Sequence, residues 1–148
     1  MRLLNMMTAR KNKVGGIYII TLCYQALLIL FFSYTLANKV ANYADFELNL
    51  QKTGLYPVGL LRPIAIATLV AEAGAIALLI WKTAYGYRFV LLLISLFTGY
   101  ICFLQIVGRY EVCGCGGILN GLTFPIHLGI NIALLVSLSI VLVYEKDI

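Results

Sequence analysis

The sequence predicts an all-α membrane protein, a bundle of four transmembrane helices with both termini on the cytoplasmic side. Hydrophobic residues make up 62% of the 148-residue chain and charged residues only 11%, whereas a soluble domain carries about 25% charged residues. The hydrophobic residues fall into four blocks, each close to the ~20 residues that cross the apolar core of a bilayer. The alternation typical of a transmembrane β-barrel is absent, so helices are the expected way to satisfy the backbone in lipid.

The four blocks define the predicted helices, which together form a single membrane domain over residues 1–148. These helices span residues 14–37, 63–81, 89–108 and 122–144. The first block is longer than the ~7–15 residue apolar core of a cleavable signal peptide, so it is interpreted as a membrane span.

The connections carry turn signals that predict where the helices begin and end. A short amphipathic helix over residues 43–50 is expected to lie at the membrane interface before Gly54. Pro63 is predicted to open the second span, and a tight turn containing Gly86 to join the second span to the third. Thr123 is the expected N-cap of the last helix.

The basic residues predict the orientation. With a cytoplasmic N-terminus, the inner side holds seven of them: Arg2, Arg10, Lys11, Lys13, Lys82, Arg88 and Lys146. The outer side holds four: Lys39, Lys52, Arg62 and Arg109. This asymmetry follows the positive-inside rule. The net charge of +5 is therefore a topology signal, and no nucleic-acid partner is expected.

Cys113 and Cys115 lie in the second outer loop, on the side where disulfides form and persist. A bridge between them needs a tight turn, which Gly114 permits, and it should be strained and readily exchanged. The alternatives are an inert clip of the loop or two free thiols. No metal is expected, because two thiolates with only His127 nearby fall short of a closed zinc site.

The other two cysteines, Cys23 and Cys102, fall inside predicted helices and are interpreted as core residues. Near the outer loop, Arg62 and Arg109 are candidates to lower the pKa of a cysteine by charge proximity.

Three polar residues fall within the predicted spans. Glu72 and Asn131 each lie nine residues beyond the predicted start of their helix, about 14 Å along its axis, and Gln25 lies at a similar depth. Since an unpaired polar group in lipid is costly, we predict one buried polar layer, with a protonated Glu72 bonded to Asn131 or Gln25. The layer is either interhelical hydrogen bonding or part of a pathway for a small molecule or ion.

His127 lies four residues before Asn131, so the two share one face of the last helix. It is either a packing residue or a group that stabilises a thiolate or passes a proton, since its ordinary pKa is close to working pH.

These features together resemble the MauE branch of the MauE/DoxX group of redox-associated membrane proteins. The matching residues are Lys39, Asp45, Phe46, Gly54, Leu55, Tyr56, Pro57, Glu72, Cys113, Gly114, Cys115 and Asn131. The resemblance implies a four-helix bundle that supports periplasmic disulfide chemistry beside a thioredoxin-like protein, akin in design to DsbB and the vitamin K epoxide reductases. Gly116 and Ile130 stand where the family pattern leads us to expect an aromatic residue and an arginine.

The leading hypothesis is a thiol–disulfide redox protein, a candidate oxidoreductase, of the bacterial cytoplasmic (inner) membrane. Cys113 and Cys115 would exchange electrons with a periplasmic thioredoxin-like partner, with His127 assisting. The alternatives are a non-catalytic accessory or scaffold subunit of a larger membrane complex, and a pathway built on Glu72. A quinone is a candidate cofactor, although no motif identifies its site. Membrane lipid is expected around the bundle.

Overall fold

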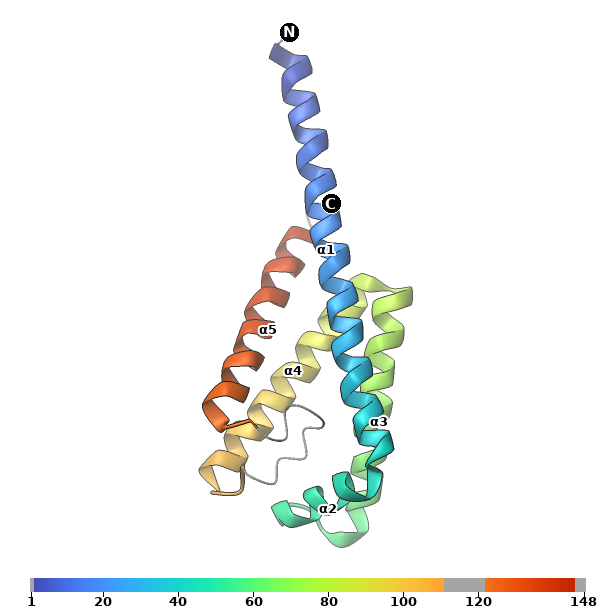
Figure 1. The fold of residues 1–148 in the computed structure, drawn as a ribbon, viewed down its shortest axis with the longest axis vertical. Helices are drawn as coiled ribbons and strands as arrows, with labels where there is room; N and C mark the ends of the chain where they lie inside the picture. The colour runs from blue at the N-terminus through green and yellow to red at the C-terminus, as the bar shows by residue number, and fades with distance from the viewer. Residues whose placement is uncertain (1, 111–121, 146–148) are drawn as a thin grey trace.

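The structure is a computed structural model that describes residues 2–110 and 122–145. Side chains are described for residues 18–110 and 122–144. Five α-helices account for most of these residues. They are α1 (Arg2–Ala41), α2 (Tyr43–Thr53), α3 (Val58–Trp81), α4 (Thr83–Ile106) and α5 (Phe124–Glu145). In Figure 1 the four long helices run along the molecule, and the short α2 lies across one end. The N-terminus of α1 extends beyond the bundle at the opposite end, toward which α5 also ends.

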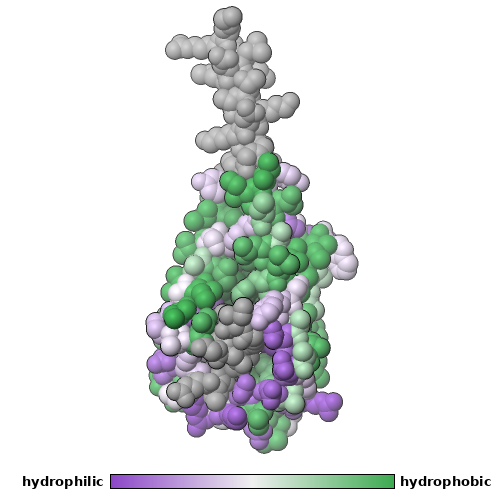
Figure 2. Space-filling model, viewed as in Figure 1, coloured by the Kyte–Doolittle hydropathy of each residue, from purple (hydrophilic) through white to green (hydrophobic). Residues whose placement is uncertain are grey.

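Four of these helices are long and apolar enough to cross a membrane. The candidate spans are Tyr18–Ala41, Val58–Trp81, Thr83–Ile106 and Phe124–Tyr144. Many of their large apolar side chains point outward and are exposed, as Leu30, Val70 and Leu96 are, which suits contact with lipid. Figure 2 shows apolar side chains over the middle of one face and hydrophilic ones at the end where α2 lies. The all-helical class with four candidate spans is therefore confirmed, while the membrane side of each end stays a prediction.

Inward-facing residues recur at alternating spacings of four and three along each span, the pattern of helices that pack along their length. The series are Leu28, Phe32, Thr35 and Lys39 on α1; Leu61, Ala65, Thr68, Glu72, Ala75 and Leu79 on α3; Val90, Ile94, Phe97, Ile101 and Leu104 on α4; His127, Asn131, Leu134 and Leu138 on α5. Most members are apolar and form the core. The polar members occupy core positions too, so their side chains are directed into the bundle.

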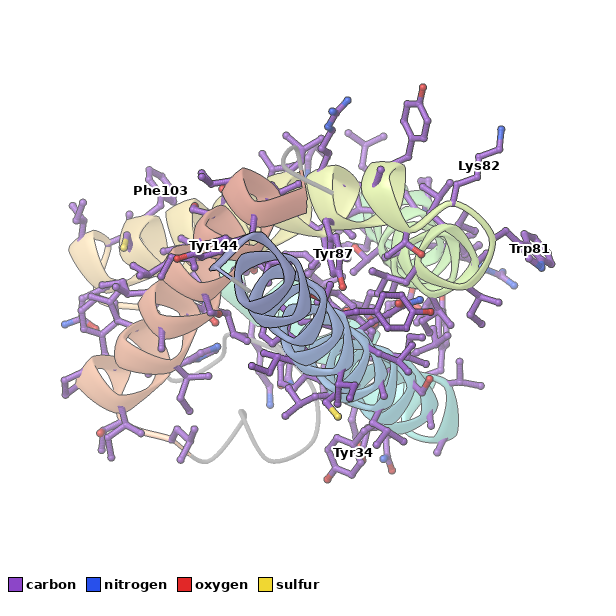
Figure 3. All side chains as sticks on the ribbon, turned by 90° about the horizontal axis from the view of Figure 1, so that it is seen from above. Tyr34, Trp81, Lys82, Tyr87, Phe103 and Tyr144 are labelled. Atoms are coloured by element: carbon purple, nitrogen blue, oxygen red, sulfur yellow. The ribbon has the colours of Figure 1, made fainter. Side chains whose placement is uncertain are left out.

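A single non-helical residue, Lys82, joins α3 to α4. The N–H of Lys82 donates to the carbonyl of Leu78 (2.8 Å), and the N–H of Gly86 donates to the carbonyl of Lys82 (2.9 Å). A β-carbon at Gly86 would lie 2.7 Å from the backbone of Leu79, closer than any real contact. Glycine therefore allows the two helices to meet, and Gly86 lies inside α4 instead of in the predicted turn. Figure 3 shows Trp81 and Lys82 pointing away from the bundle at this hairpin.

Several helix boundaries differ from the predicted ones. α1 runs from Arg2 to Ala41, and α4 begins at Thr83. α3 begins at Val58, so Pro63 lies inside the helix and not at its start. The break falls at Pro57, whose extended conformation (φ −58°, ψ 146°) precedes the first helical turn. A proline is favoured beside a helix N-terminus, and the sequence offers two.

The predicted short amphipathic helix is present as α2, although it extends to Thr53, and its place at the membrane interface stays a prediction. Its residues Phe46 and Leu50 are buried and pack with Leu61 and Ala65 near the start of α3. α2 ends at Gly54, which adopts the left-handed conformation (φ 63°) that favours glycine. The helix thus folds back onto the end of the bundle that holds the polar core residues.

Candidate functional site

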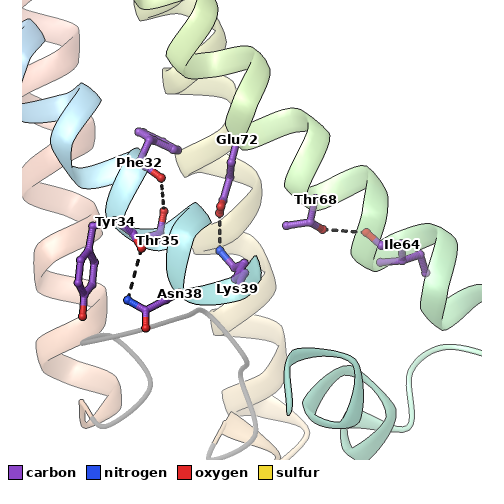
Figure 4. Close-up of polar contacts among 8 residues, drawn as sticks. All are labelled: Phe32, Tyr34, Thr35, Asn38, Lys39, Ile64, Thr68 and Glu72. Atoms are coloured by element: carbon purple, nitrogen blue, oxygen red, sulfur yellow. Dashed lines mark hydrogen bonds and ion pairs between the residues drawn. The ribbon is translucent and has the colours of Figure 1, made fainter. Parts of the chain in front are cut away.

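An ion pair is buried between α1 and α3. The ammonium of Lys39 donates to Oε1 of Glu72, and the two side chains are only 4% and 2% exposed. Figure 4 shows them reaching toward each other from neighbouring helices. One turn before Lys39, the hydroxyl of Thr35 donates to the carbonyl of Phe32 (3.0 Å). In a low-dielectric interior, removing one member of such a pair leaves an uncompensated charge, which costs about 3–5 kcal/mol.

Two aromatic rings enclose the ammonium of Lys39. Its nitrogen lies 5.8 Å from the ring centre of Phe46 on α2 and 5.8 Å from that of Phe97 on α4. At this distance the face of an aromatic ring attracts a cation. Four helices therefore contribute to one charged centre, and α2 closes it with Phe46.

The predicted polar layer is partly wrong. Glu72 and Asn131 are both buried, but no hydrogen bond joins them within the described ranges, and the partner of Glu72 is Lys39. Gln25 is only half-buried, and its amide donates to the carbonyl of Leu79 (2.6 Å) near the α3–α4 hairpin. Residue 79 is seven positions beyond Glu72, about 10 Å along α3. Gln25 therefore belongs to a different level of the bundle.

A cavity of about 260 Å³ adjoins the ion pair. It is bounded by the five helices, and Glu72 and Asn131 meet there as lining residues, together with Lys39 and His127. The rest of the wall is mainly aromatic and aliphatic. Each member of the predicted polar set except Gln25 thus faces one internal space. No cluster of metal-ligating side chains occurs among the residues with described positions.

Tyr110 holds His127 at the α2 end of the bundle. Its hydroxyl lies 3.0 Å from the carbonyl of Leu122 and 3.0 Å from Nδ1 of His127. Burial raises the pKa of Tyr110 above its ordinary value, so its hydroxyl keeps its proton at neutral pH. A carbonyl can only accept, so the hydroxyl proton goes to Leu122 and Nδ1–H of His127 donates to Tyr110. This assignment leaves Nε2 as the unprotonated, basic nitrogen of His127.

Local structure after α4 explains how Tyr110 reaches this position. Gly108 is left-handed (φ 71°), the N–H of Arg109 donates to the carbonyl of Leu104 (2.8 Å), and that of Gly108 to Gln105 (3.1 Å). These two bonds form a Schellman cap, which turns the chain sharply at a helix end. Tyr110 is thereby brought against the first turn of α5, where its ring meets Phe124 edge-on at 5.3 Å.

Arg109 and Arg62, the two arginines proposed to act on a cysteine, differ in their surroundings. The guanidinium of Arg109 donates to the carbonyl of Thr53 and lies against Gly54, so it caps the C-terminus of α2. This contact ties the end of α4 to α2. Arg62 is exposed on α3. The role predicted for Arg109 beside a thiol therefore competes with a structural one that the sequence did not indicate.

Cys113 and Cys115 lie outside the described residues, in the segment 111–121 between Tyr110 and Leu122. The other two cysteines are free thiols in the structure. Cys102 is half-buried, whereas Cys23 is exposed on the outer face of α1. The interpretation of Cys23 as a core residue is therefore wrong: the inward series of α1 passes through Leu28 and Phe32, and Cys23 falls outside it.

Two residues of the site were missed or misplaced by sequence reasoning. The sequence predicts Lys39 among the outer charges, yet its side chain is 4% exposed. Lys39 lies seven residues after Phe32 and four after Thr35, so it continues the same face of α1. This spacing indicates that its side chain is directed into the bundle. Tyr110 is not singled out by the sequence analysis, and no local pattern indicates its bond to His127, which is seventeen residues away.

Comparison with known proteins gives one finding. A family model described as methylamine utilisation protein MauE matches residues 17–144, which include every residue of the site. No curated protein and no solved structure shows a significant match to the chain.

Proposed function

The chain belongs to the MauE family of membrane proteins, linked by its description to methylamine utilisation, and we propose that it is a thiol–disulfide redox protein. In this proposal Cys113 and Cys115 exchange electrons with a thioredoxin-like protein on the periplasmic side of a bacterial cytoplasmic membrane. The family match confirms the resemblance drawn from the sequence. The redox activity is our inference from the cysteine spacing and from the site next to it.

The observation that carries the proposal is the bond between Tyr110 and Leu122. These residues flank the segment that contains both cysteines, and the hydroxyl of one lies 3.0 Å from the carbonyl of the other. The last described residue before the segment therefore bonds both to the first described residue after it and to His127. Cys113 follows Tyr110 by three residues, which span at most ~11 Å, and Tyr110 contacts His127.

His127 supplies the proton chemistry that thiol exchange needs. A thiolate is the nucleophile in disulfide exchange, and a neighbouring base increases its population. With Nδ1–H donated to Tyr110, Nε2 accepts the proton from the attacking cysteine. The base is buried and held in one tautomer, an arrangement that a purely packing histidine does not require.

The exchange balances as a two-electron transfer in which no other oxidant takes part. The thiolate of one cysteine attacks the disulfide of the partner, forming a mixed disulfide and releasing a partner thiolate. The second cysteine then attacks the mixed disulfide, which leaves Cys113 and Cys115 oxidised and the partner reduced. The reverse sequence oxidises the partner, and the relative reduction potentials decide the direction.

Trapping the mixed disulfide tests this proposal. Cys113→Ser and Cys115→Ser are each reduced and then mixed with a thioredoxin-like protein whose two cysteines form a disulfide, and the exchange is quenched by alkylation. One of the two variants should accumulate a covalent adduct that thiol reductants release, and the double variant should form none. Absence of an adduct from both variants, together with full function of the double variant, would support an accessory or scaffold subunit instead.

A further inference from the structure

Two polar atoms at the cavity have no hydrogen-bond partner in the described part of the chain. They are Oε2 of Glu72 and the hydroxyl oxygen of Tyr100, and both are buried. Both residues line the cavity. The nearby hydroxyl of Thr35 donates to the carbonyl of Phe32 (3.0 Å). Unsatisfied buried acceptors are costly and uncommon, which points to a ligand that completes them.

The charge of the site limits what this ligand can be. Lys39 and Glu72 form a close pair, so their opposite charges cancel. A charged ligand would bring an uncompensated charge into a low-dielectric space, which is strongly unfavourable. The unpaired carboxylate oxygen, by contrast, accepts a hydrogen bond from a neutral O–H group. An uncharged donor therefore fits the site best.

The walls and volume define the body of the ligand. Aromatic side chains from three helices line the cavity, among them Phe31, Phe46, Phe97 and Tyr100. Its volume of about 260 Å³ exceeds the ~150 Å³ in which an apolar protein cavity holds benzene. One substituted aromatic ring fits this space and can make the offset or edge-on contacts that aromatic groups favour.

We propose that this cavity binds an uncharged, lipid-soluble molecule that has one aromatic ring and a hydroxyl group, with the hydroxyl donating to Oε2 of Glu72. The outward faces of the spans are apolar and contact lipid, so such a molecule reaches the bundle from the bilayer. The cysteines take no part in this binding, and the inference does not rest on the proposed redox function.

Two isomeric test ligands distinguish the contribution of the hydrogen bond to affinity from that of apolar contacts. 4-Propylphenol has the hydroxyl donor, whereas 4-ethylanisole has the same atoms and no donor. Equilibrium dialysis against the full chain in lipid nanodiscs measures binding, and empty nanodiscs of the same lipid correct for partition into the bilayer. We expect one saturable site per chain, with at least about tenfold tighter binding of the phenol, because hydrogen bonds to charged groups are strong.

Variants locate the donor contact. In the double variant Lys39→Met/Glu72→Leu both charges are replaced by apolar groups, and the preference for the phenol should fall to about twofold or less. The control Ser95→Ala changes an exposed residue on α4 and should keep the full preference. Equal binding of the two isomers to the wild-type chain, or no saturable binding above empty nanodiscs, overturns the proposal even if the double variant does not fold.

Discussion

Replacing Glu72 by leucine tests the buried ion pair most severely. The variant leaves the ammonium of Lys39 inside the bundle, 4% exposed, with only the rings of Phe46 and Phe97 nearby, each 5.8 Å away. A cation–ring contact is worth roughly 0.5–2 kcal/mol, which does not offset the loss of a buried counter-ion. We therefore expect the free energy of unfolding to fall by about 3–5 kcal/mol.

The double variant Lys39→Met/Glu72→Leu should behave differently. Replacing both members of a buried pair by apolar groups of similar volume is often neutral or stabilising, so its stability should lie within about 1 kcal/mol of wild type or above it. Reversible unfolding in mixed micelles, followed by circular dichroism, measures all three proteins. A Glu72→Leu variant as stable as wild type, or a double variant as unstable as the single one, would refute this account of the pair.

Three further predictions follow from the packing and the topology. Gly86→Ala should lower the stability by about 1–3 kcal/mol because the methyl group meets the backbone of α3, whereas Gly99→Ala, with nothing within 4 Å, should not. Tyr110→Phe should slow thiol exchange and cost about 1–3 kcal/mol, since Nδ1 of His127 loses its acceptor; an unchanged exchange rate contradicts the assigned role. Membrane-impermeant thiol reagents should label the cysteines of segment 111–121 in intact, reduced cells, and labelling only after permeabilisation would reverse the orientation.

The fold could be predicted because its signals are local. Four apolar blocks of sufficient length define the spans, and the short amphipathic segment at α2 is confirmed. Thr123 precedes α5 as predicted, and the N–H of His127 donates to its carbonyl (3.1 Å). Helix caps and membrane spans depend on residues that are close together in the chain, so the sequence alone can predict them.

The partner of Glu72 could not be predicted in the same way. Its depth was estimated from Pro63, but α3 begins five residues earlier at Val58, which shifts the estimate by about 7.5 Å. Lys39 is predicted to lie outside because it follows the first apolar block, which ends at residue 37. A buried charge is tolerated only when an opposite charge from another helix meets it, and that contact depends on the packing of α1 against α3.

The ion pair of Lys39 also bears on the charge asymmetry between the two ends of the bundle. When Lys39 is left out because it pairs with Glu72, the predicted outer side has three basic residues, against seven on the predicted inner side. The three are Lys52, Arg62 and Arg109. Of these, Arg109 caps α2 through the carbonyl of Thr53. This asymmetry still follows the positive-inside rule, and the orientation with cytoplasmic termini stays a prediction.

The reduction potential of the Cys113–Cys115 pair tests the central proposal most directly. The purified full-length chain is equilibrated in thiol buffers of defined potential, and the oxidised fraction is measured by alkylation of free thiols and mass spectrometry. A disulfide that spans a single glycine should be strained and exchangeable, so we predict a potential above about −300 mV. A potential below about −300 mV would place the pair among inert structural disulfides and contradict a redox role.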